Sequence, residues 1–124
     1  MKITKTNIDG LIIVEPEIFK DNRGSFFESW NVKKFQEIGI EDHFVQDNQS
    51  NSSKGILRGL HFQKPPFSQT KLVRVVKGKV LDIAVDLRKK SKTYGKFESI
   101  ILSDENKKQL LVPKGFAHGF LVLS

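Results

Sequence analysis

The amino-acid sequence predicts an all-β domain of the jelly-roll kind, built as a β-sandwich or barrel. About eight short apolar or alternating segments are separated by turn residues, and a single stretch has helical character. Many short strands with turn signals between them are typical of sandwiches and barrels rather than of parallel α/β folds. At 124 residues the chain is long enough for one hydrophobic core, so we expect residues 1–124 to form a single domain.

Turn-forming residues bound each element in the first half of the chain. Asn31 is a suitable N-cap and Gly39 a suitable stop, so the stretch between them predicts one short helix, Val32–Ile38. It is the only helical signal that we find. The other elements expected here are strands at 11–14 and 25–30, an extended segment at 44–51 and a loop at 51–55.

The strand Arg58–Gln63 lies at the centre of the functional argument. Leu60 and Phe62 alternate with His61 and Gln63, so the period of a strand sends the two kinds of side chain to opposite faces. Polar side chains on one face of a half-apolar strand suggest the floor of a pocket. Further strands are expected at 71–76, 79–87, 96–102, 109–112 and 117–123.

Lys77-Gly78 predicts a two-residue hairpin turn between the strands on either side of it. The resulting register places Lys71, Asp82 and Asp86 on one face of the hairpin. Aliphatic residues of 79–87 occupy the other face. Acidic groups on one side and aliphatic groups on the other indicate a sheet with a wet or ligand-facing interior.

The last residues, Phe120–Ser124, form an apolar run without a turn, a cap or a charge. A terminal strand so bare is a poor sheet edge unless it is covered. We therefore expect the domain to be incomplete at its C-terminus. The alternative is that this run pairs in the middle of a sheet.

Composition excludes several classes of function. The net charge is +7, with 21 Lys and Arg against 14 Asp and Glu, which favours an anionic partner. The lysines are scattered over turns, and no basic stripe with aromatics or nucleic-acid-binding motif occurs, so we expect no nucleic-acid partner. The absence of cysteine excludes disulfides and thiol chemistry. No signal-peptide-like or membrane-length apolar run is present, so we expect no membrane partner and a cytoplasmic location.

Half of a metal site is visible in the sequence. Pro113–His118 matches the PxGxxH part of the cupin metal signature. The other part requires HxH and a nearby Glu, but the chain reads His61-Phe62-Gln63, with no acid through Thr70. Because a stable site usually needs three or more protein ligands, we predict no metal and no other cofactor.

Proton transfer is the better match for these residues. Histidine changes its charge near neutral pH, so His61 is suited to removing a proton from the carbon next to a ketone. A nearby cation such as Lys71 could stabilise the enolate oxygen that results. The alternatives are a hydrogen-bonded core histidine and a solvated strand lysine.

Two arginines are candidates for binding an anion. Arg23 precedes Gly24 in a tight turn, and Arg58 precedes Gly59, where the backbone can approach a ligand. The planar guanidinium makes paired hydrogen bonds to phosphate. Strict alternation places Arg58 and His61 on opposite faces, so both can serve one ligand only if Gly59 kinks the strand. The alternative is two surface arginines.

Taken together, these motifs resemble the dTDP-4-dehydrorhamnose 3,5-epimerase family. The resemblance extends over nearly the whole chain, and its motifs follow the order of the family. They are Phe19–Phe26, Gln46–Ser50, Arg58–Gln63, Lys71–Arg74 and Pro113–Phe120.

The resemblance implies a metal-free cupin jelly roll that forms a homodimer. It implies epimerisation of dTDP-4-dehydro-6-deoxy-D-glucose at C3 and C5 through enolates, which gives dTDP-4-dehydro-L-rhamnose for dTDP-L-rhamnose biosynthesis. His61 would be the general base, and Lys71 would support the enolate. Arg23 and Glu28 would reach the site of the partner subunit through exchanged N-terminal segments. The residues implied to hold the nucleotide sugar are Arg23, Glu28, Gln46, Asp47, Asn48, Arg58 and His118.

The sequence departs from the family at two catalytic positions. The family's proton donor is a Tyr beyond the His-Gly-Phe motif, and the Asp that orients the base lies further on. No residue up to Ser124 matches either, and the only tyrosine, Tyr94, lies in the loop 88–95. We therefore expect binding to be retained and turnover to be slow. The alternatives are a related sugar-nucleotide 3,4-ketoisomerase or mono-epimerase, a non-catalytic sugar-nucleotide-binding cupin and a metal-dependent cupin oxygenase.

Overall fold

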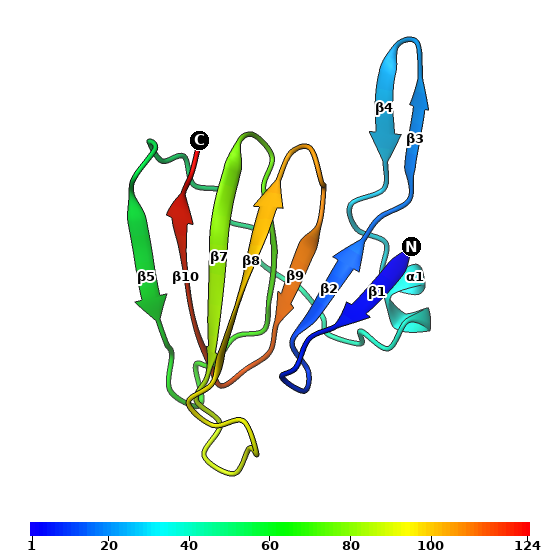
Figure 1. Ribbon diagram of the computed structural model, residues 1–124. Coiled ribbons are helices and arrows are strands. Elements are labelled where there is room, and N and C mark those ends of the chain that lie inside the picture. The colour runs from blue at the N-terminus through cyan, green and yellow to red at the C-terminus, as the bar shows by residue number, and fades with distance from the viewer.

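The computed structural model describes residues 1–124 and consists of two antiparallel sheets, a projecting hairpin and one helix (Figure 1). The elements are β1 (Lys2–Lys5), β2 (Ile12–Glu15), β3 (Ile18–Asp21), β4 (Gly24–Phe27), α1 (Val32–Glu37), β5 (Leu57–His61), β6 (Lys71–Arg74), β7 (Lys79–Asp86), β8 (Phe97–Ser103), β9 (Gln109–Val112) and β10 (Phe116–Val122). One sheet has the strand order β1-β2-β9-β6 and the other the order β5-β10-β7-β8. The all-β jelly-roll prediction is confirmed.

The core lies between the two sheets. Leu110 and Val112 of β9 share one buried cluster with Ala84 of β7 and Leu102 of β8, so side chains from opposite sheets meet there. Burial of each large aliphatic side chain of this kind contributes about 1.5–3 kcal/mol. Ile8 and Leu11, in the turn between β1 and β2, join the same cluster. This packing sets the separation of the sheets and therefore the space available to polar side chains that point inward.

The helix covers the outer face of the first sheet. The Asn31 side chain accepts a hydrogen bond from the Lys34 backbone N–H at 3.1 Å, which is the predicted N-cap. Phe35 is 1% exposed and packs with Val14 and Leu111 of the sheet below it. The helix has six residues, and no helix in the structure has the length and apolar character needed to cross a membrane.

The predicted hairpin at Lys77-Gly78 is wrong. β6 pairs with β9 and β7 pairs with β8 and β10, so the segment between β6 and β7 crosses from one sheet to the other. The turn is held by a residue distant in sequence, because the Gly78 N–H donates to Asp104 Oδ2 at 3.0 Å and the Gly78 carbonyl accepts from the Asp104 N–H at 3.0 Å. A prediction from neighbouring residues cannot include these hydrogen bonds, because Asp104 lies far along the chain.

The C-terminal strand is not a sheet edge. β10 lies between β5 and β7, and its residues 116–122 pair with β7 along their whole length. The alternative, that this run pairs in the middle of a sheet, therefore describes β10, and central pairing accounts for the uninterrupted apolar run. β1 and β3 are also present although no strand was expected there.

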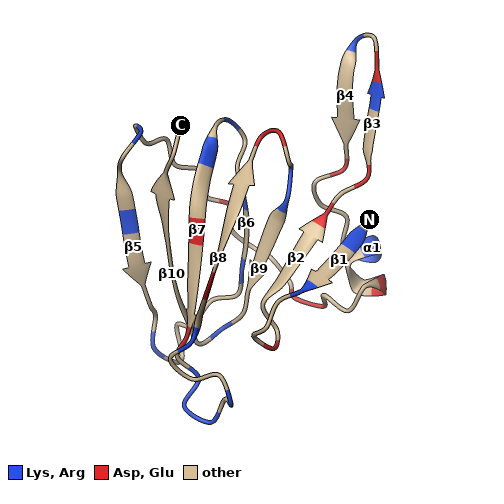
Figure 2. Cartoon of the chain, in the orientation of Figure 1, with Lys and Arg blue, Asp and Glu red and all other residues tan.

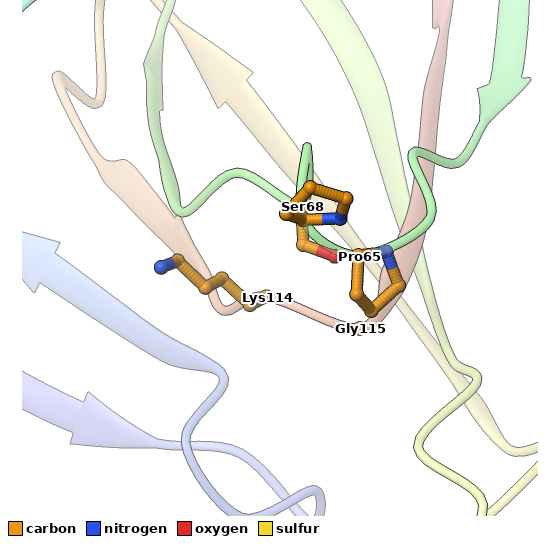
Figure 3. A pocket seen from close by; sticks show the side chains of 5 residues that line it. Pro65, Ser68, Lys114 and Gly115 are labelled. Atoms are coloured by element: carbon orange, nitrogen blue, oxygen red, sulfur yellow. The ribbon is translucent and has the colours of Figure 1, made fainter.

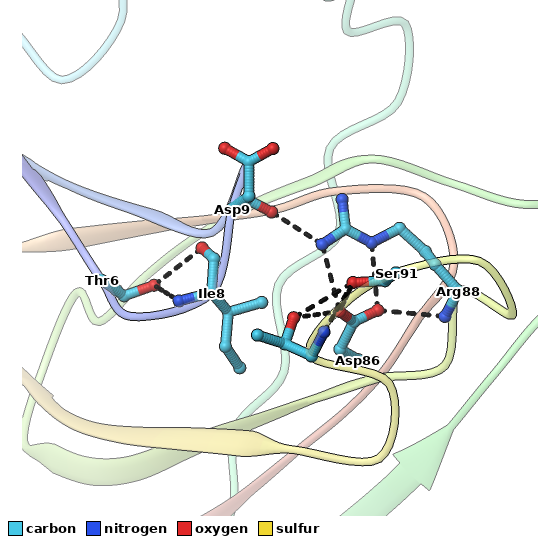
Figure 4. Close-up of polar contacts among 7 residues, drawn as sticks. Thr6, Ile8, Asp9, Asp86, Arg88 and Ser91 are labelled. Atoms are coloured by element: carbon cyan, nitrogen blue, oxygen red, sulfur yellow. Dashed lines mark hydrogen bonds and ion pairs between the residues drawn. The ribbon is translucent and has the colours of Figure 1, made fainter.

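A carboxylate fastens the loops at one end of the sandwich (Figure 4). Asp86 is fully buried and accepts hydrogen bonds from the Arg88 guanidinium at 3.0 and 3.1 Å and from the hydroxyls of Ser91 and Thr93 at 2.6 Å. Arg88 also donates to the Asp9 carbonyl at 2.7 Å. Burial alone would raise the pKa of Asp86, but these hydrogen bonds hold that pKa far below its ordinary value.

The β3–β4 hairpin pairs with no other strand and projects away from the two sheets (Figure 1). Phe19 and Phe26 face each other across this hairpin and are 56% and 70% exposed. Large aromatic side chains so exposed on an isolated hairpin are typical of a surface that contacts another chain.

Candidate active site

An irregular pairing between β5 and β10 gives the candidate site its shape. His61 pairs with His118, and Arg58 pairs with Phe120, so two residues on β5 oppose the single Gly119 on β10. Such a bulge reverses the alternation of the strand beyond it. Arg58 and His61 therefore lie on the same face, which is the condition the sequence required for both to serve one ligand.

Glycine is needed at the centre of this bulge. Gly59 has a φ of +96°, and a Cβ atom there would lie 2.6 Å from the His118 carbonyl oxygen and 2.8 Å from Gly119 Cα. A Cβ on Gly119 would in turn lie 2.5 Å from the Arg58 carbonyl oxygen. The two strands can approach this closely only because neither residue carries a side chain.

The face that carries Arg58 and His61 is the interior face of the sheet. Phe116, on the same side of β10 as His118, belongs to the core between the sheets. His118 pairs with Ala84, which is also part of that core. His61 lies at the end of an edge strand, so its side chain borders the interior and remains exposed.

A buried, hydrogen-bonded histidine–carboxylate pair lies beside these residues. His118 Nε2 is 2.9 Å from both carboxylate oxygens of Asp82, and the two residues are 8% and 0% exposed. Burial raises the pKa of Asp82, while hydrogen bonding to His118 and, more weakly, the charge of Lys71 lower it. Burial dominates, so the pKa of this carboxyl lies above its ordinary value.

Lys71 approaches from the opposite sheet. It begins β6, two residues from Val73, which packs against the core, so both side chains lie on the interior face. No ion pair involves Lys71, which leaves its ammonium group free for a ligand. The expectation that Lys71 and Asp82 lie on one face of a hairpin is therefore wrong, because β6 and β7 belong to different sheets; the two residues lie on the facing, interior sides of those sheets.

Two of the expected binding residues lie elsewhere. Arg23, at the tip of the β3–β4 hairpin, pairs with Asp21 at 2.6 Å, and Glu28 pairs with Lys34 at 3.1 Å. The hairpin and β5 are on opposite sides of the molecule (Figure 1). Within one chain, Arg23 and Glu28 do not reach His61.

The run Gln46-Asp47-Asn48 belongs to an exposed segment without regular secondary structure. The Gln46 side-chain amide donates to Asn48 Oδ1 at 3.2 Å. Further along this segment, Ser52 Oγ accepts a hydrogen bond from Arg58 Nε at 2.8 Å. That bond ties the end of the segment to the strand that carries His61.

Two hollows lie outside this group of residues. A cavity of about 360 Å³ is lined by Pro65, Pro66, Ser68, Lys114 and Gly115, between the loop after β5 and the loop before β10 (Figure 3). A second, of about 540 Å³, lies on the β3–β4 hairpin and includes Arg23. Lys and Arg are spread over many loops, with the loop after β7 the most uniformly basic (Figure 2).

Asp82 is the residue of this site that sequence reasoning did not assign. The signal was present, because Asp82, Ala84 and Asp86 alternate with Leu81, Ile83 and Val85. What the alternation could not distinguish is the role of each acid. No group of three or more His, Cys, Asp or Glu residues in the structure is arranged to hold a metal ion.

Comparisons with known proteins converge on one family. The family model described as dTDP-4-dehydrorhamnose 3,5-epimerase matches residues 5–124. The chain is 55% identical over 123 residues to the dTDP-4-dehydrorhamnose 3,5-epimerase of Methanothermobacter thermautotrophicus, covering 99% of this chain and 66% of that protein. Identity to the Shigella flexneri enzyme of the same name is 56% over 125 residues, covering 100% of this chain and 69% of that protein. The chain thus spans about two-thirds of the length of these relatives.

Solved structures give the same result. A dTDP-4-dehydrorhamnose 3,5-epimerase from Elizabethkingia anophelis superposes with a TM-score of 0.93 at 55% identity, covering 100% of this chain and 68% of that one. A dTDP-6-deoxy-D-glucose-3,5-epimerase from Legionella pneumophila, in complex with dTDP-4-keto-L-rhamnose, gives 0.94 at 55% identity, covering 99% and 65%. A 3'-monoepimerase from Streptomyces bikiniensis, in complex with dTDP-quinovose, gives 0.89 at 32% identity, covering 96% and 61%.

Proposed function

The chain belongs to the dTDP-4-dehydrorhamnose 3,5-epimerase family, and from this premise we propose that its residues bind dTDP-4-dehydro-6-deoxy-D-glucose and epimerise C3 and C5 through enolate intermediates. The product would be dTDP-4-dehydro-L-rhamnose, for dTDP-L-rhamnose biosynthesis in the cytoplasm, without a metal or other cofactor. The observation that carries the proposal is the arrangement of Arg58, His61 and Lys71 around the interior between the two sheets.

The reaction needs a base that removes a proton next to the ketone and a cation near the ketone oxygen. The C4 carbonyl lies next to both C3 and C5, so it acidifies the C–H bond at either carbon. His61 would take the proton, and the electron pair of that bond would move to the carbonyl oxygen as an enolate. The Lys71 ammonium would stabilise that oxygen. A proton from water, delivered to the opposite face of the same carbon, would complete the inversion, and His61 would release the proton it took to solvent. General-base catalysis contributes roughly 10²–10⁴-fold, and a well-placed charge about 10²–10³-fold.

The remaining residues would hold the nucleotide. Arg58 can bind the diphosphate with two parallel hydrogen bonds, and the net charge of +7 favours approach of an anionic ligand. Gln46, Asp47, Asn48 and His118 would contact the nucleotide sugar from the elements that border β5.

We propose that Arg23 and Glu28 act in the site of a partner subunit. The β3–β4 hairpin projects from the sandwich and exposes two phenylalanines, as expected of a segment exchanged in a homodimer (Figure 1). The test is to mix the Arg23→Ala and His61→Ala variants. Each alone should be inactive, while a 1:1 mixture should recover about a quarter of the wild-type sites, because about half of the dimers are mixed and one of the two sites in each mixed dimer carries neither change. No recovery on mixing would contradict subunit exchange.

A mono-epimerase is the second candidate, because the chain is also 32% identical to a 3'-monoepimerase. The two activities differ in which carbon exchanges its proton with solvent. A 3,5-epimerase exchanges both C3 and C5, whereas a mono-epimerase exchanges one of them.

Proton NMR of dTDP-4-dehydro-6-deoxy-D-glucose in D₂O would test the proposal directly. We expect the C3 and C5 proton signals to be lost with the wild-type chain and to persist with His61→Ala. His43→Ala is the matched control, because His43 is exposed and lies outside the site, and it should behave as wild type. Loss of a single signal would favour the mono-epimerase. Binding of dTDP without any exchange would refute catalysis by these residues.

A further inference from the structure

The buried carboxylate of Asp82 has a single protein partner. Both of its oxygens lie 2.9 Å from His118 Nε2, and it makes no other hydrogen bond within the chain. Because a carboxylate only accepts hydrogen bonds while it is ionised, the atom between its two oxygens must carry the proton. Asp82 therefore selects the ring state of His118 in which Nε2 is protonated.

The other ring nitrogen of His118 remains available. His118 Nδ1 has no hydrogen-bond partner in the chain, and the only fully buried side-chain polar atom without a partner is Gln109 Oε1. Nδ1 is thus accessible, although the residue as a whole is 8% exposed. It lies on the interior face, next to His61 in the β5–β10 pairing.

A stability role does not explain Asp82. Asp86 lies four residues along the same strand and is equally buried, but it is surrounded by hydrogen-bond donors from Arg88, Ser91 and Thr93. Asp82 has no comparable set, and burial raises its pKa, so the ionised form is disfavoured by folding. Carboxylates that weaken a fold and yet contact one functional side chain are typical of active sites.

We propose that Asp82 is a positioning residue, which holds the His118 ring with its Nε2 proton directed at the carboxylate so that Nδ1 faces the bound nucleotide sugar. This inference rests on the proposed function and deepens it. Asp82 does not touch the substrate, and it acts through His118.

The first test is spectroscopic and does not depend on activity. Long-range ¹H–¹⁵N correlation on the labelled chain should show that Nε2 of His118 is protonated, with its proton shifted downfield and protected from solvent exchange. In Asp82→Asn the ionic hydrogen bond becomes a neutral one, so this proton should move upfield and exchange faster. A His118 ring with a bare Nε2 in the wild type would overturn the proposal.

Thermal unfolding separates positioning from a structural role. Asp82→Asn should leave Tm unchanged or raise it, because it removes a buried charge that has one partner. Asp86→Asn is the matched control on the same strand, and it should lower Tm by about 5 °C or more while leaving the His118 signal unchanged. Equal losses of Tm in the two variants would mean that Asp82 is structural.

Ligand binding completes the test. Asp82→Asn should weaken dTDP-4-dehydro-6-deoxy-D-glucose binding about five- to ten-fold, the difference between an ionic and a neutral hydrogen bond. If Asp82 acts through His118, the double variant with His118→Gln should bind no more weakly than His118→Gln alone. A wild type that shows the His118 signal but binds no nucleotide sugar would refute the proposed function. A wild type that binds it no better than Asp82→Asn would refute the role of Asp82.

Discussion

Replacement of Gly59 by alanine should disrupt the bulge that places Arg58 and His61 on one face. The residue has a φ of +96°, and an added Cβ would lie 2.6 Å from the His118 carbonyl oxygen. A backbone carbonyl cannot move aside as a flexible side chain can, so the two strands must separate or β5 must change its register. Either change turns His61 away from the interior.

Gly55 is a matched control that separates the cost of a positive φ from the cost of a steric clash. Gly55 has a φ of +89°, but a Cβ there would meet no atom within 4 Å. Gly55→Ala should therefore destabilise the fold by about 1–2 kcal/mol, the cost of a positive φ for an L-residue. Gly59→Ala should lose that amount and about 1–3 kcal/mol more for the overpacking.

The measurements are urea unfolding and the exchange of substrate protons in D₂O. Gly59→Ala should lower the exchange rate at least ten-fold, about 1.4 kcal/mol in the barrier, while Gly55→Ala should leave it near that of wild type. Equal stability and equal exchange in the two variants would refute the reasoning, because the close approach of β5 and β10 would then have no consequence.

Three further predictions concern the supports of the site. The pKa of Asp86 is lowered by folding, so the ionised form stabilises the protein above about pH 4, and that contribution is lost as the pH falls. The urea midpoint should accordingly fall more steeply below about pH 4 in wild type than in Asp86→Asn, and parallel curves would contradict the assignment. Phe35→Ala should lower the free energy of unfolding, measured in urea, by about 3–5 kcal/mol, because Phe35 is buried. It should also shift the fluorescence of Trp30, because the centroids of the two rings are 4.4 Å apart. An unchanged spectrum would argue against their contact. Arg58→Lys keeps the positive charge but removes the planar guanidinium that makes two parallel hydrogen bonds, so dTDP affinity should fall about ten-fold. An unchanged affinity would mean that Arg58 does not bind the diphosphate in this way.

Local chemistry was enough to predict most of the elements. The alternation of 79–86, the turn residues between strands and the Asn31 cap each depend on neighbours within a few positions, so they can be read directly from the chain. β1 and β3 were missed because each has four residues and owes its strand conformation to a partner rather than to its own pattern.

The candidate site was predictable as a set of residues but not as an arrangement. Resemblance identified His61, Lys71 and His118, and period-two alternation predicted that the acids of β7 point inward. Alternation could not supply the extra residue opposite Gly119, because a bulge depends on how two strands distant in sequence meet.

What the sequence by itself determined is the all-β class, the helix with its cap and the set of candidate side chains for the site. Only the tertiary structure decided which sheet each strand joins, and this corrected the hairpin at Lys77-Gly78. It also distinguished Asp82, which contacts one histidine, from Asp86, which fastens three loop residues. The physical reason is that sheet pairing and burial are set by contacts between distant segments, whereas propensity and period act only between neighbours.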